Sequence, residues 1–250
     1  MTAGFVTLTV DSESLALAAA ALRDGGVVGV PTDTVYGLAA DPSRPDAIEL
    51  LFALKERPAE VALPVLVDGR EQVSAVCGPL GRAAEHLARR YWPGPLTLVV
   101  PRRRTFTADL GGPPSARQTV GVRWPDHQAT QALCRQLGPL AVTSANRHGA
   151  PPATRADQVA EIFMGAEGLS LILDGGVCEG TPSTVVECRG PAVRCLREGS
   201  IPWGDLVGDG RVDSSPSSWA RETDAALPVP AGAPAHEDPR NPHPPSATIA

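Results

Sequence analysis

Short apolar runs recur along this chain and alternate with stretches of helical periodicity. The runs are rich in Val, Leu and Ile and occupy residues 27–30, 63–67, 96–100, 120–122, 140–142, 169–173 and 185–186. Runs of this length and composition are typical of buried strands. Apolar spacing between the runs indicates helices at residues 14–23, 45–55, 80–90, 128–137 and 155–163. The alternation predicts an α/β sheet fold, with antiparallel pairs where strands follow closely, as around Val185 and Val193.

A change of composition near residue 208 sets the expected domain boundary. Of the 250 residues, 42% are hydrophobic, which is enough for a proper core. From residue 208 onward Asp, Ser, Ala and Pro dominate, and such a segment buries too little apolar surface to offset its ordering entropy. We therefore expect one functional domain at residues 1–207 and a disordered tail at residues 208–250.

Charge and apolar patterning disfavour several classes of protein. The net charge of −6 argues against binding nucleic acid through bulk charge, and the densest basic run, residues 102–104, is typical of a solvated turn. No apolar run approaches the ~18 residues of a membrane span and no signal-peptide pattern is present, so the cytoplasm is the expected compartment. The five cysteines form no C-x-x-C pair, and we expect them to be small buried side chains without a disulfide or a metal site.

The most specific compositional feature is a single lysine. Lys55 is the only lysine among the 22 Lys and Arg residues, and it begins the sequence Lys55-Glu56-Arg57-Pro58 at the end of an expected helix. Basic residues in a last helical turn often only complement the helix dipole. A compact ammonium beside a forked guanidinium, however, suits a triphosphate whose charge shifts during reaction. We therefore take Lys55 and Arg57 as candidate phosphate-binding residues.

Three further polar segments stand at strand ends, where α/β sheets usually bind ligands. They are residues 31–42 (PTDTVYGLAADP), residues 143–146 (TSAN) and residues 174–186, after which Arg197-Glu198-Gly199 closes the domain. Each also has a purely structural interpretation. The first could be a turn followed by a helix cap, the second a local turn, and the third a plain hairpin with Gly-Gly.

The chain lacks several common signatures of catalysis and nucleotide binding. It contains no G-x-x-x-x-G-K-[ST] loop and no G-x-G-x-x-G after a strand. Its histidines have no metal-like spacing, and no Ser-His-Asp or Cys-His arrangement is compelling. If the chain binds ATP, it does so without either of these two glycine-rich motifs.

Six segments, taken in order, resemble the YrdC/Sua5 family over roughly residues 10–205. They are PTDTVYGL, KERP, YWPGPLTLVV, VGVRWP, SAN and PSTVV. The resemblance implies an α/β fold with a twisted, mixed parallel and antiparallel sheet, flanking helices and a concave, positively lined cavity. It also implies a nucleotidyltransferase that makes L-threonylcarbamoyladenylate from L-threonine, bicarbonate and ATP and releases pyrophosphate, for the t6A37 modification of tRNA.

The resemblance also implies roles residue by residue. Lys55 and Arg57 would be catalytic and contact the phosphates and the carbamate. The residues that would bind threonine are Thr32, Arg123, Thr143 and Ser183. The residues that would bind the nucleotide are Thr119, Ser144, Asn146 and Arg197. Mg²⁺ would be carried by ATP, without a dedicated protein site.

The chain departs from the family pattern in two places. Val61-Ala62 stands where family members commonly have a Lys-Pro or Asn-Pro pair, and residues 150–153 read Ala-Pro-Pro-Ala where a serine is common. Both departures leave room for an altered substrate. Residues 208–250 are too short and too polar for the second domain of longer Sua5 members, so the resemblance is to the short, single-domain form.

Two alternative functions remain open beside the adenylate-forming enzyme, and the enzyme would have a defined set of partners. The alternatives are a YrdC-like domain that forms a carbamoyl-adenylate and a non-catalytic RNA-binding protein. The acidic net charge and the Lys55-Arg57 pair favour an enzyme. Its partners would be the small-molecule substrates and the tRNA-modifying threonylcarbamoyl transferase complex, with weak or no direct tRNA binding and no membrane.

Overall fold

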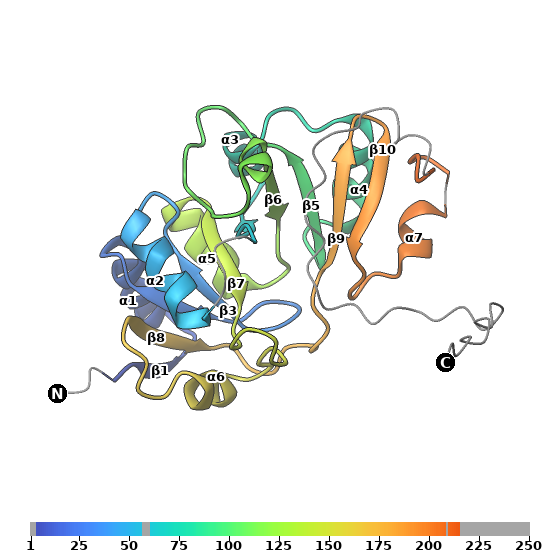
Figure 1. Ribbon diagram of the computed structural model, residues 1–250. Helices are drawn as coiled ribbons and strands as arrows, with labels where there is room; N and C mark the ends of the chain where they lie inside the picture. Colours follow the sequence, from blue (N-terminus) through green and yellow to red (C-terminus); the bar gives the residue numbers. More distant parts are fainter. Residues whose placement is uncertain (1–3, 57–60, 209, 216–250) are drawn as a thin grey trace, which may run out of the picture.

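The computed structural model describes residues 4–56, 61–208 and 210–215 (Figure 1). Its strands are β1 (Val6–Thr9), β2 (Val27–Val30), β3 (Gly37–Ala40), β4 (Val65–Leu66), β5 (Leu96–Pro101), β6 (Thr119–Arg123), β7 (Leu140–Ser144), β8 (Leu169–Asp174), β9 (Thr184–Arg189) and β10 (Ala192–Arg197). Its helices are α1 (Ser12–Arg23), α2 (Pro45–Lys55), α3 (Arg70–Val76), α4 (Arg82–Tyr91), the 3₁₀ helix η1 (Pro114–Gln118), α5 (Gln128–Leu137), α6 (Ala156–Ile162) and α7 (Trp203–Val207). The expected α/β fold is confirmed.

The strands of the described residues form one mixed sheet. Its order is β1-β8-β2-β3-β7-β4-β6-β5-β9-β10. The pairs β1·β8, β2·β8, β4·β6 and β5·β9 are parallel, and the other neighbours are antiparallel. The antiparallel pairing predicted around Val185 and Val193 is confirmed, because β10 pairs with β9 in that sense.

The pleat of the strands separates two apolar cores. In β3, Leu38 belongs to the larger core and Ala39 to the smaller one, because successive side chains of a strand point to opposite faces. The smaller core contains buried residues of α1 and α5, and the larger core contains buried residues of α2, α4 and α6. Figure 1 shows α1, α2 and α5 beside one half of the sheet and α4 near the other half. Both faces of the sheet are therefore covered.

Local signals explain where the helices that frame the site begin and end. Helix α1 begins with a capping box between Asp11 and Ser14, and the chain leaves it through Gly25 at φ 87°. Helix α2 begins with Pro45 in its first turn and ends at Glu56, which has the left-handed φ of 52°. This end of α2 directs Lys55 toward the middle of the sheet.

Several elements were not predicted from the sequence. Strands β1 and β3 and helices α3 and α7 correspond to no predicted run. Strand β3 lies inside the segment 31–42, which a turn and a helix cap could also have explained. Its sequence, GLAA, has no alternation to signal a strand, because both faces of the strand are buried, with Leu38 in the larger core and Ala39 in the smaller one.

The packed chain continues past the expected boundary at residue 207. Val212 is only 7% exposed, and the backbone of Asp213 makes a bridge to Ala192 at the start of β10. Val193 N donates to Asp213 O at 2.8 Å, and Asp213 N donates to Pro191 O at 3.1 Å. The ordered domain therefore reaches Ser215. Residues 216–250 lie outside the described residues, and their disorder stays a prediction.

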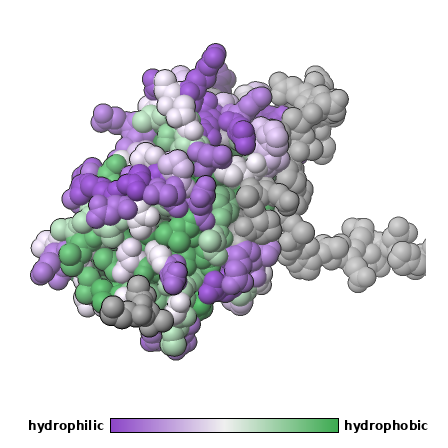
Figure 2. All heavy atoms as spheres, turned by 60° about the vertical axis from the view of Figure 1, so that its left-hand side comes forward, coloured by the Kyte–Doolittle hydropathy of each residue, from purple (hydrophilic) through white to green (hydrophobic). Residues whose placement is uncertain are grey.

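The molecular surface carries scattered apolar side chains. Figure 2 brings forward the side of the molecule with α1, α2 and β1 and shows apolar surface among polar side chains. The large apolar side chains that are exposed are Val6, Leu17, Met164 and Val177. Within the described ranges, no helix has both the length and the apolar character needed to cross a membrane.

Four of the five cysteines are small buried side chains, as predicted. Cys77, Cys134, Cys178 and Cys188 are buried, and Cys195 is half-buried. Desolvation raises the pKa of Cys77 to about 11 and the pKa of Cys134 to about 12. These thiols are therefore protonated at neutral pH, and their location is consistent with packing rather than chemistry.

The contact between residues 210–215 and β10 predicts where the chain can be shortened. A protein ending at Ser215 should unfold at nearly the same temperature as the full chain. A protein ending at Gly208 loses Val212 from the core and the two hydrogen bonds of Asp213, and we expect it to be less stable by about 1–3 kcal/mol. Thermal unfolding of the three proteins measures this difference. Equal melting temperatures for both truncations would contradict a packing role for residues 210–215.

Candidate active site

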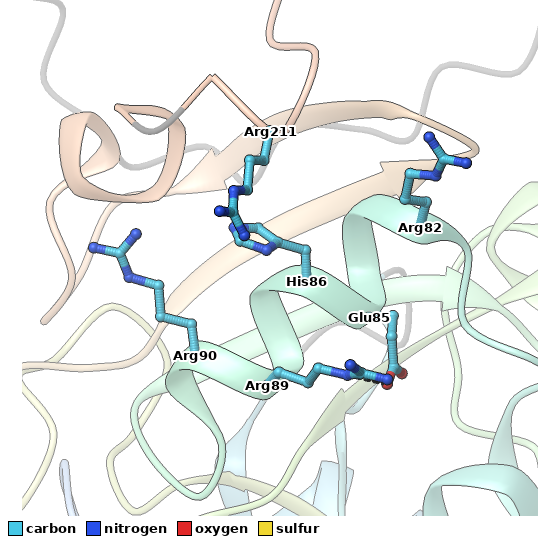
Figure 3. Close-up of a pocket in the computed structure, with 6 residues that line it drawn as sticks. All are labelled: Arg82, Glu85, His86, Arg89, Arg90 and Arg211. Carbon is cyan, nitrogen blue, oxygen red and sulfur yellow. Dashed lines mark hydrogen bonds and ion pairs between the residues drawn. The ribbon is translucent and has the colours of Figure 1, made fainter.

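Two hollows of similar size occur in the described part of the molecule, and only one contains predicted site residues. One, of about 480 Å³, lies on the outer side of α4 (Figure 3) and is lined by Arg82, Glu85, His86, Arg89, Arg90 and Arg211. Glu85 there accepts from Arg70 at 2.8 Å and from Arg89 at 2.7 Å. The other, of about 470 Å³, opens along β5, β6 and β7. Volume does not distinguish them, but the second is the candidate site because the predicted residues converge there.

This cavity collects residues from distant parts of the chain. The predicted residues that line it are Thr32, Thr119, Arg123, Thr143, Ser144, Ser183 and Arg197. Further polar side chains in its wall belong to Thr34, which lies in the predicted ligand-binding segment 31–42, and to Thr97 and Arg102, which were not predicted. Among the described lining residues there is no Asp or Glu. The cavity therefore presents hydroxyls and guanidinium groups in an otherwise apolar wall.

The loop after β2 presents its hydroxyls by folding into a tight turn around Thr32. The Thr32 Oγ1 atom donates to Val35 O at 2.6 Å and accepts from Thr34 N at 3.1 Å and from Val35 N at 3.2 Å. The side chain is 4% exposed. The turn interpretation is thus confirmed, and Thr32 also lines the cavity, whereas a contact of Thr32 with a ligand stays a prediction.

Arg123 at the end of β6 is held by protein oxygens on three sides. Its Nε donates to Gly94 O at 3.1 Å, its Nη1 to Thr34 Oγ1 at 2.9 Å and its Nη2 to Asp33 Oδ1 at 2.5 Å. Desolvation lowers the pKa of Arg123, and the Asp33 carboxylate opposes that shift. The guanidinium stays charged, because arginine side chains are not deprotonated in proteins.

Arg197 and Ser183 form a second polar group in the cavity wall. Arg197 donates from Nε and Nη2 to Ser183 O at 3.2 and 2.9 Å, and Ser183 Oγ lies 2.9 Å from Thr97 Oγ1. Desolvation and the positive charge of Arg123 both lower the pKa of Arg197. Among the described residues no carboxylate forms an ion pair with Arg197, so its charge is available to an anionic ligand.

Lys55 lies behind the cavity wall instead of lining it. Its Nζ is within hydrogen-bond distance of Ser144 O (2.8 Å), Ser144 Oγ (3.1 Å), Asn146 O (3.2 Å) and Asn146 Oδ1 (2.7 Å). The side chain is 4% exposed. Lys55 thus ties the end of α2 to the segment after β7. A contact between Lys55 and phosphate stays a prediction, and Arg57 lies outside the described residues.

Asn146 is also buried behind the cavity. It is 7% exposed, and its Nδ2 donates to Arg147 O at 3.0 Å and to Ala150 O. Ser144 belongs to the lining, whereas Asn146 does not. The nucleotide role predicted for Asn146 therefore stays a prediction, and its observed contacts organise the loop beside Ser144.

The cavity wall also contains residues that the sequence did not place in a binding site. Arg102 lines the cavity, so the solvated turn predicted for residues 102–104 is wrong for this residue. Its Nε donates to Phe106 O at 2.7 Å. Val61 and Ala62 also line the cavity, so this departure from the family pattern changes the wall itself.

Thr97 could have been found from strand alternation. Leu96, Leu98 and Val100 belong to the large core, whereas Thr97 and Val99 line the cavity. This is the two-residue period of a strand with one polar residue on its other face. The neighbours of Arg123 had no comparable signal, because they come from separate segments of the chain.

The buried position of Lys55 predicts a cost in stability when its ammonium is removed. In Lys55→Met the aliphatic stem is kept, but the oxygens of Ser144 and Asn146 lose their donor, and we expect a loss of about 1–3 kcal/mol in the free energy of unfolding. Arg23→Met, at the exposed end of α1, is the matched control and should change stability by less than about 0.5 kcal/mol. Denaturant unfolding measures both. Equal stability of Lys55→Met and the parent protein would show that these hydrogen bonds contribute nothing net.

Comparison with known proteins gives one consistent picture. The Sua5_yciO_yrdC family model, described as "Telomere recombination", matches residues 20–199. Threonylcarbamoyl-AMP synthase of Bacillus subtilis is 37% identical over 201 residues, covering 78% of this chain and 56% of the relative. A putative threonylcarbamoyl-AMP synthase of Mycobacterium tuberculosis is 36% identical over 191 residues, covering 76% of this chain and 86% of the relative.

A solved structure agrees with these sequence relatives. The crystal structure of Pyrococcus abyssi Sua5 complexed with L-threonine superposes with a TM-score of 0.74 at 32% identity, covering 89% of this chain and 65% of that protein. The chain thus spans less than two thirds of both the B. subtilis relative and the P. abyssi protein. The expected twisted mixed sheet matches this structure.

Proposed function

The chain belongs to the Sua5/YciO/YrdC family, and on this basis we propose that it is an L-threonylcarbamoyladenylate synthase. It would use L-threonine, bicarbonate and ATP, release pyrophosphate, and supply the t6A37 modification of tRNA. The observation that carries the proposal is the cavity, which combines Arg123, Arg197 and several hydroxyls with a described lining that has no Asp or Glu. Such a wall suits ligands that carry carboxylate and phosphate groups.

Threonine is assigned to the part of the cavity around Arg123. Thr32, Arg123, Thr143 and Ser183 all line the cavity, and they are the residues that the family motif assigns to threonine. A guanidinium supplies donors for the carboxylate, and buried hydroxyls can pair with the hydroxyl or the amino group. The L-threonine complex of P. abyssi Sua5 supports this substrate.

The nucleotide is assigned to the part of the cavity around Thr119, Ser144 and Arg197, with Asn146 behind the wall. Arg197 would contact a phosphate, because the described residues leave its charge without a carboxylate. Lys55 would contact the phosphates if its ammonium exchanged its hydrogen bonds to Ser144 and Asn146 for hydrogen bonds to phosphate oxygens. Arg57 would act beside it. Mg²⁺ would be carried by the triphosphate, because the described lining provides no carboxylate ligand.

The reaction can then proceed by placement and charge neutralisation. The amino group of threonine attacks CO₂ derived from bicarbonate and forms a carbamate, with loss of one proton. A carbamate oxygen attacks the α-phosphorus of ATP, and the bond to pyrophosphate breaks. Oriented reactants and fixed positive charge are the main contributions in such phosphoryl chemistry, so the site does not require a dedicated general base.

We also propose a setting for this activity. The product would pass to the threonylcarbamoyl transferase complex that modifies tRNA, and the protein would work in the cytoplasm with weak or no direct tRNA binding. The net charge of −6 supports the last point, because it opposes binding of nucleic acid by bulk charge.

Substrate selectivity tests the proposal directly. Purified protein is given ATP, bicarbonate and one of L-threonine, L-serine or L-valine, and pyrophosphate release is measured. L-Threonine should be best and L-valine worst. Loss of a hydrogen-bonded hydroxyl in a buried site costs up to ~10⁴-fold, whereas one missing methyl costs only about 10-fold.

Three outcomes would count against the proposal. Equal use of the three amino acids would contradict a site for the threonine hydroxyl. Pyrophosphate release driven by carbamoyl phosphate without any amino acid would favour the carbamoyl-adenylate alternative. A lack of pyrophosphate release under all conditions would leave the non-catalytic alternative.

A further inference from the structure

Asp33 lies beside the cavity and makes its main contact with a residue of the cavity wall. Its Oδ1 accepts from Arg123 Nη2 at 2.5 Å and from Asp126 N at 3.1 Å. The side chains of Arg123 and Asp33 are 7% and 13% exposed. Asp33 is not among the described residues that line the cavity, whereas Arg123 is. Any effect of Asp33 on a ligand must therefore act through its neighbours.

The contacts of Arg123 leave a defined set of donors for a ligand. A guanidinium has five N–H groups in a rigid fork. Nε donates to Gly94 O, Nη1 to Thr34 Oγ1 and Nη2 to Asp33 Oδ1. The other two N–H groups, one on each terminal nitrogen, have no acceptor among the described residues. A carboxylate that binds arginine through both of its oxygens accepts two hydrogen bonds, one from each of two N–H groups.

The Asp33 contact differs in kind from the other two. Gly94 O and Thr34 Oγ1 are neutral acceptors, whereas Asp33 is an anion in a place with little solvent. Its second oxygen, Oδ2, is buried and has no hydrogen-bond partner among the described residues. A buried carboxylate is costly unless it is paired, so the position of Asp33 depends on the pair with Arg123.

We propose that Asp33 is a positioning residue, which holds the Arg123 fork so that its two remaining N–H groups meet the carboxylate of the amino-acid substrate. The inference rests on the proposed function for the identity of that substrate. Arginine has several rotatable bonds, and a side chain without this anchor would lose rotamer entropy on binding each ligand. Fixing the fork in advance avoids that cost for the carboxylate contact.

The test compares three variants in direct binding, without turnover. Asp33→Ala removes the anchor. Asp33→Asn keeps a similar shape and an acceptor oxygen for Arg123. Asp126→Asn is the matched control, because it removes an exposed carboxylate nearby and keeps the backbone N–H that donates to Asp33. Calorimetry measures the Kd of each protein for L-threonine and for L-threonine methyl ester, which lacks the carboxylate charge.

We expect Asp33→Ala to bind L-threonine about 10- to 100-fold more weakly than the parent protein, the range for a hydrogen bond to a charged group. Asp33→Asn should recover most of this loss, and Asp126→Asn should match the parent. The methyl ester should bind the parent protein weakly, and the Asp33→Ala substitution should reduce the affinity for the ester little further. In a separate turnover assay, the KM for ATP should change less than the KM for L-threonine.

The ester separates positioning from general damage to the fold. If Asp33→Ala weakens threonine and its ester alike, Asp33 acts by supporting the structure, and the inference is wrong. Equal losses in Asp33→Asn and Asp33→Ala, with binding of the ester little changed, would show that the carboxylate charge holds the fork, which agrees with the anionic character of this contact. If Asp33→Ala does not fold, an unchanged Kd in Asp33→Asn together with a threonine-specific loss in Thr34→Val would support the anchored fork, and a loss for the ester as well would reject it.

Failure of the proposed function has a different signature. A parent protein that binds neither threonine nor its ester would contradict the substrate assignment and remove the basis of this inference. A parent protein that binds threonine, with an Asp33→Ala variant of equal affinity, would contradict the role of Asp33 alone.

Discussion

Two buried cations, Lys55 and Arg123, join segments of the chain that the sheet alone does not join. Lys55 connects the end of α2 to Ser144 and Asn146 after β7. Arg123 connects the end of β6 to Gly94 and to the loop after β2. A buried cation must be surrounded by oxygens, because an unpaired charge in a low-dielectric interior is very costly. The loops that supply these oxygens are thereby drawn to the cavity.

The mixed sheet gives these loops their positions. Strands β3 and β7 are antiparallel neighbours, with Gly37 opposite Ser144, so the end of β7 lies beside the start of β3. Strand β4 pairs in parallel with β6, and its Leu66 lies opposite Arg123. Polar residues that are more than a hundred positions apart in sequence, such as Thr32 and Ser144, therefore line one cavity. The same strands carry the apolar cores on their other positions.

Much of the fold could be predicted from local patterns. Helices α2 and α5 have the predicted bounds, because Pro45 and the apolar spacing mark them clearly. Strand β3 was missed because it is buried on both faces and too short for periodicity to appear. The boundary at residue 207 was set too early, because a polar composition does not reveal that Val212 packs in the core. A run of three arginines is typical of a solvated turn and does not reveal that Arg102 lines the cavity.

The sequence by itself determined the α/β class, the family resemblance and the residue types that can bind anions, because strand and helix periods and short motifs are local properties. The tertiary structure decided which of those residues share a cavity. It placed Thr32, Arg123, Ser183 and Arg197 in one wall, and Lys55 and Asn146 behind it. It also paired Arg123 with Asp33. Side-chain partners depend on which strands lie next to each other and on the need to compensate each buried charge, and neither is a property of a single segment.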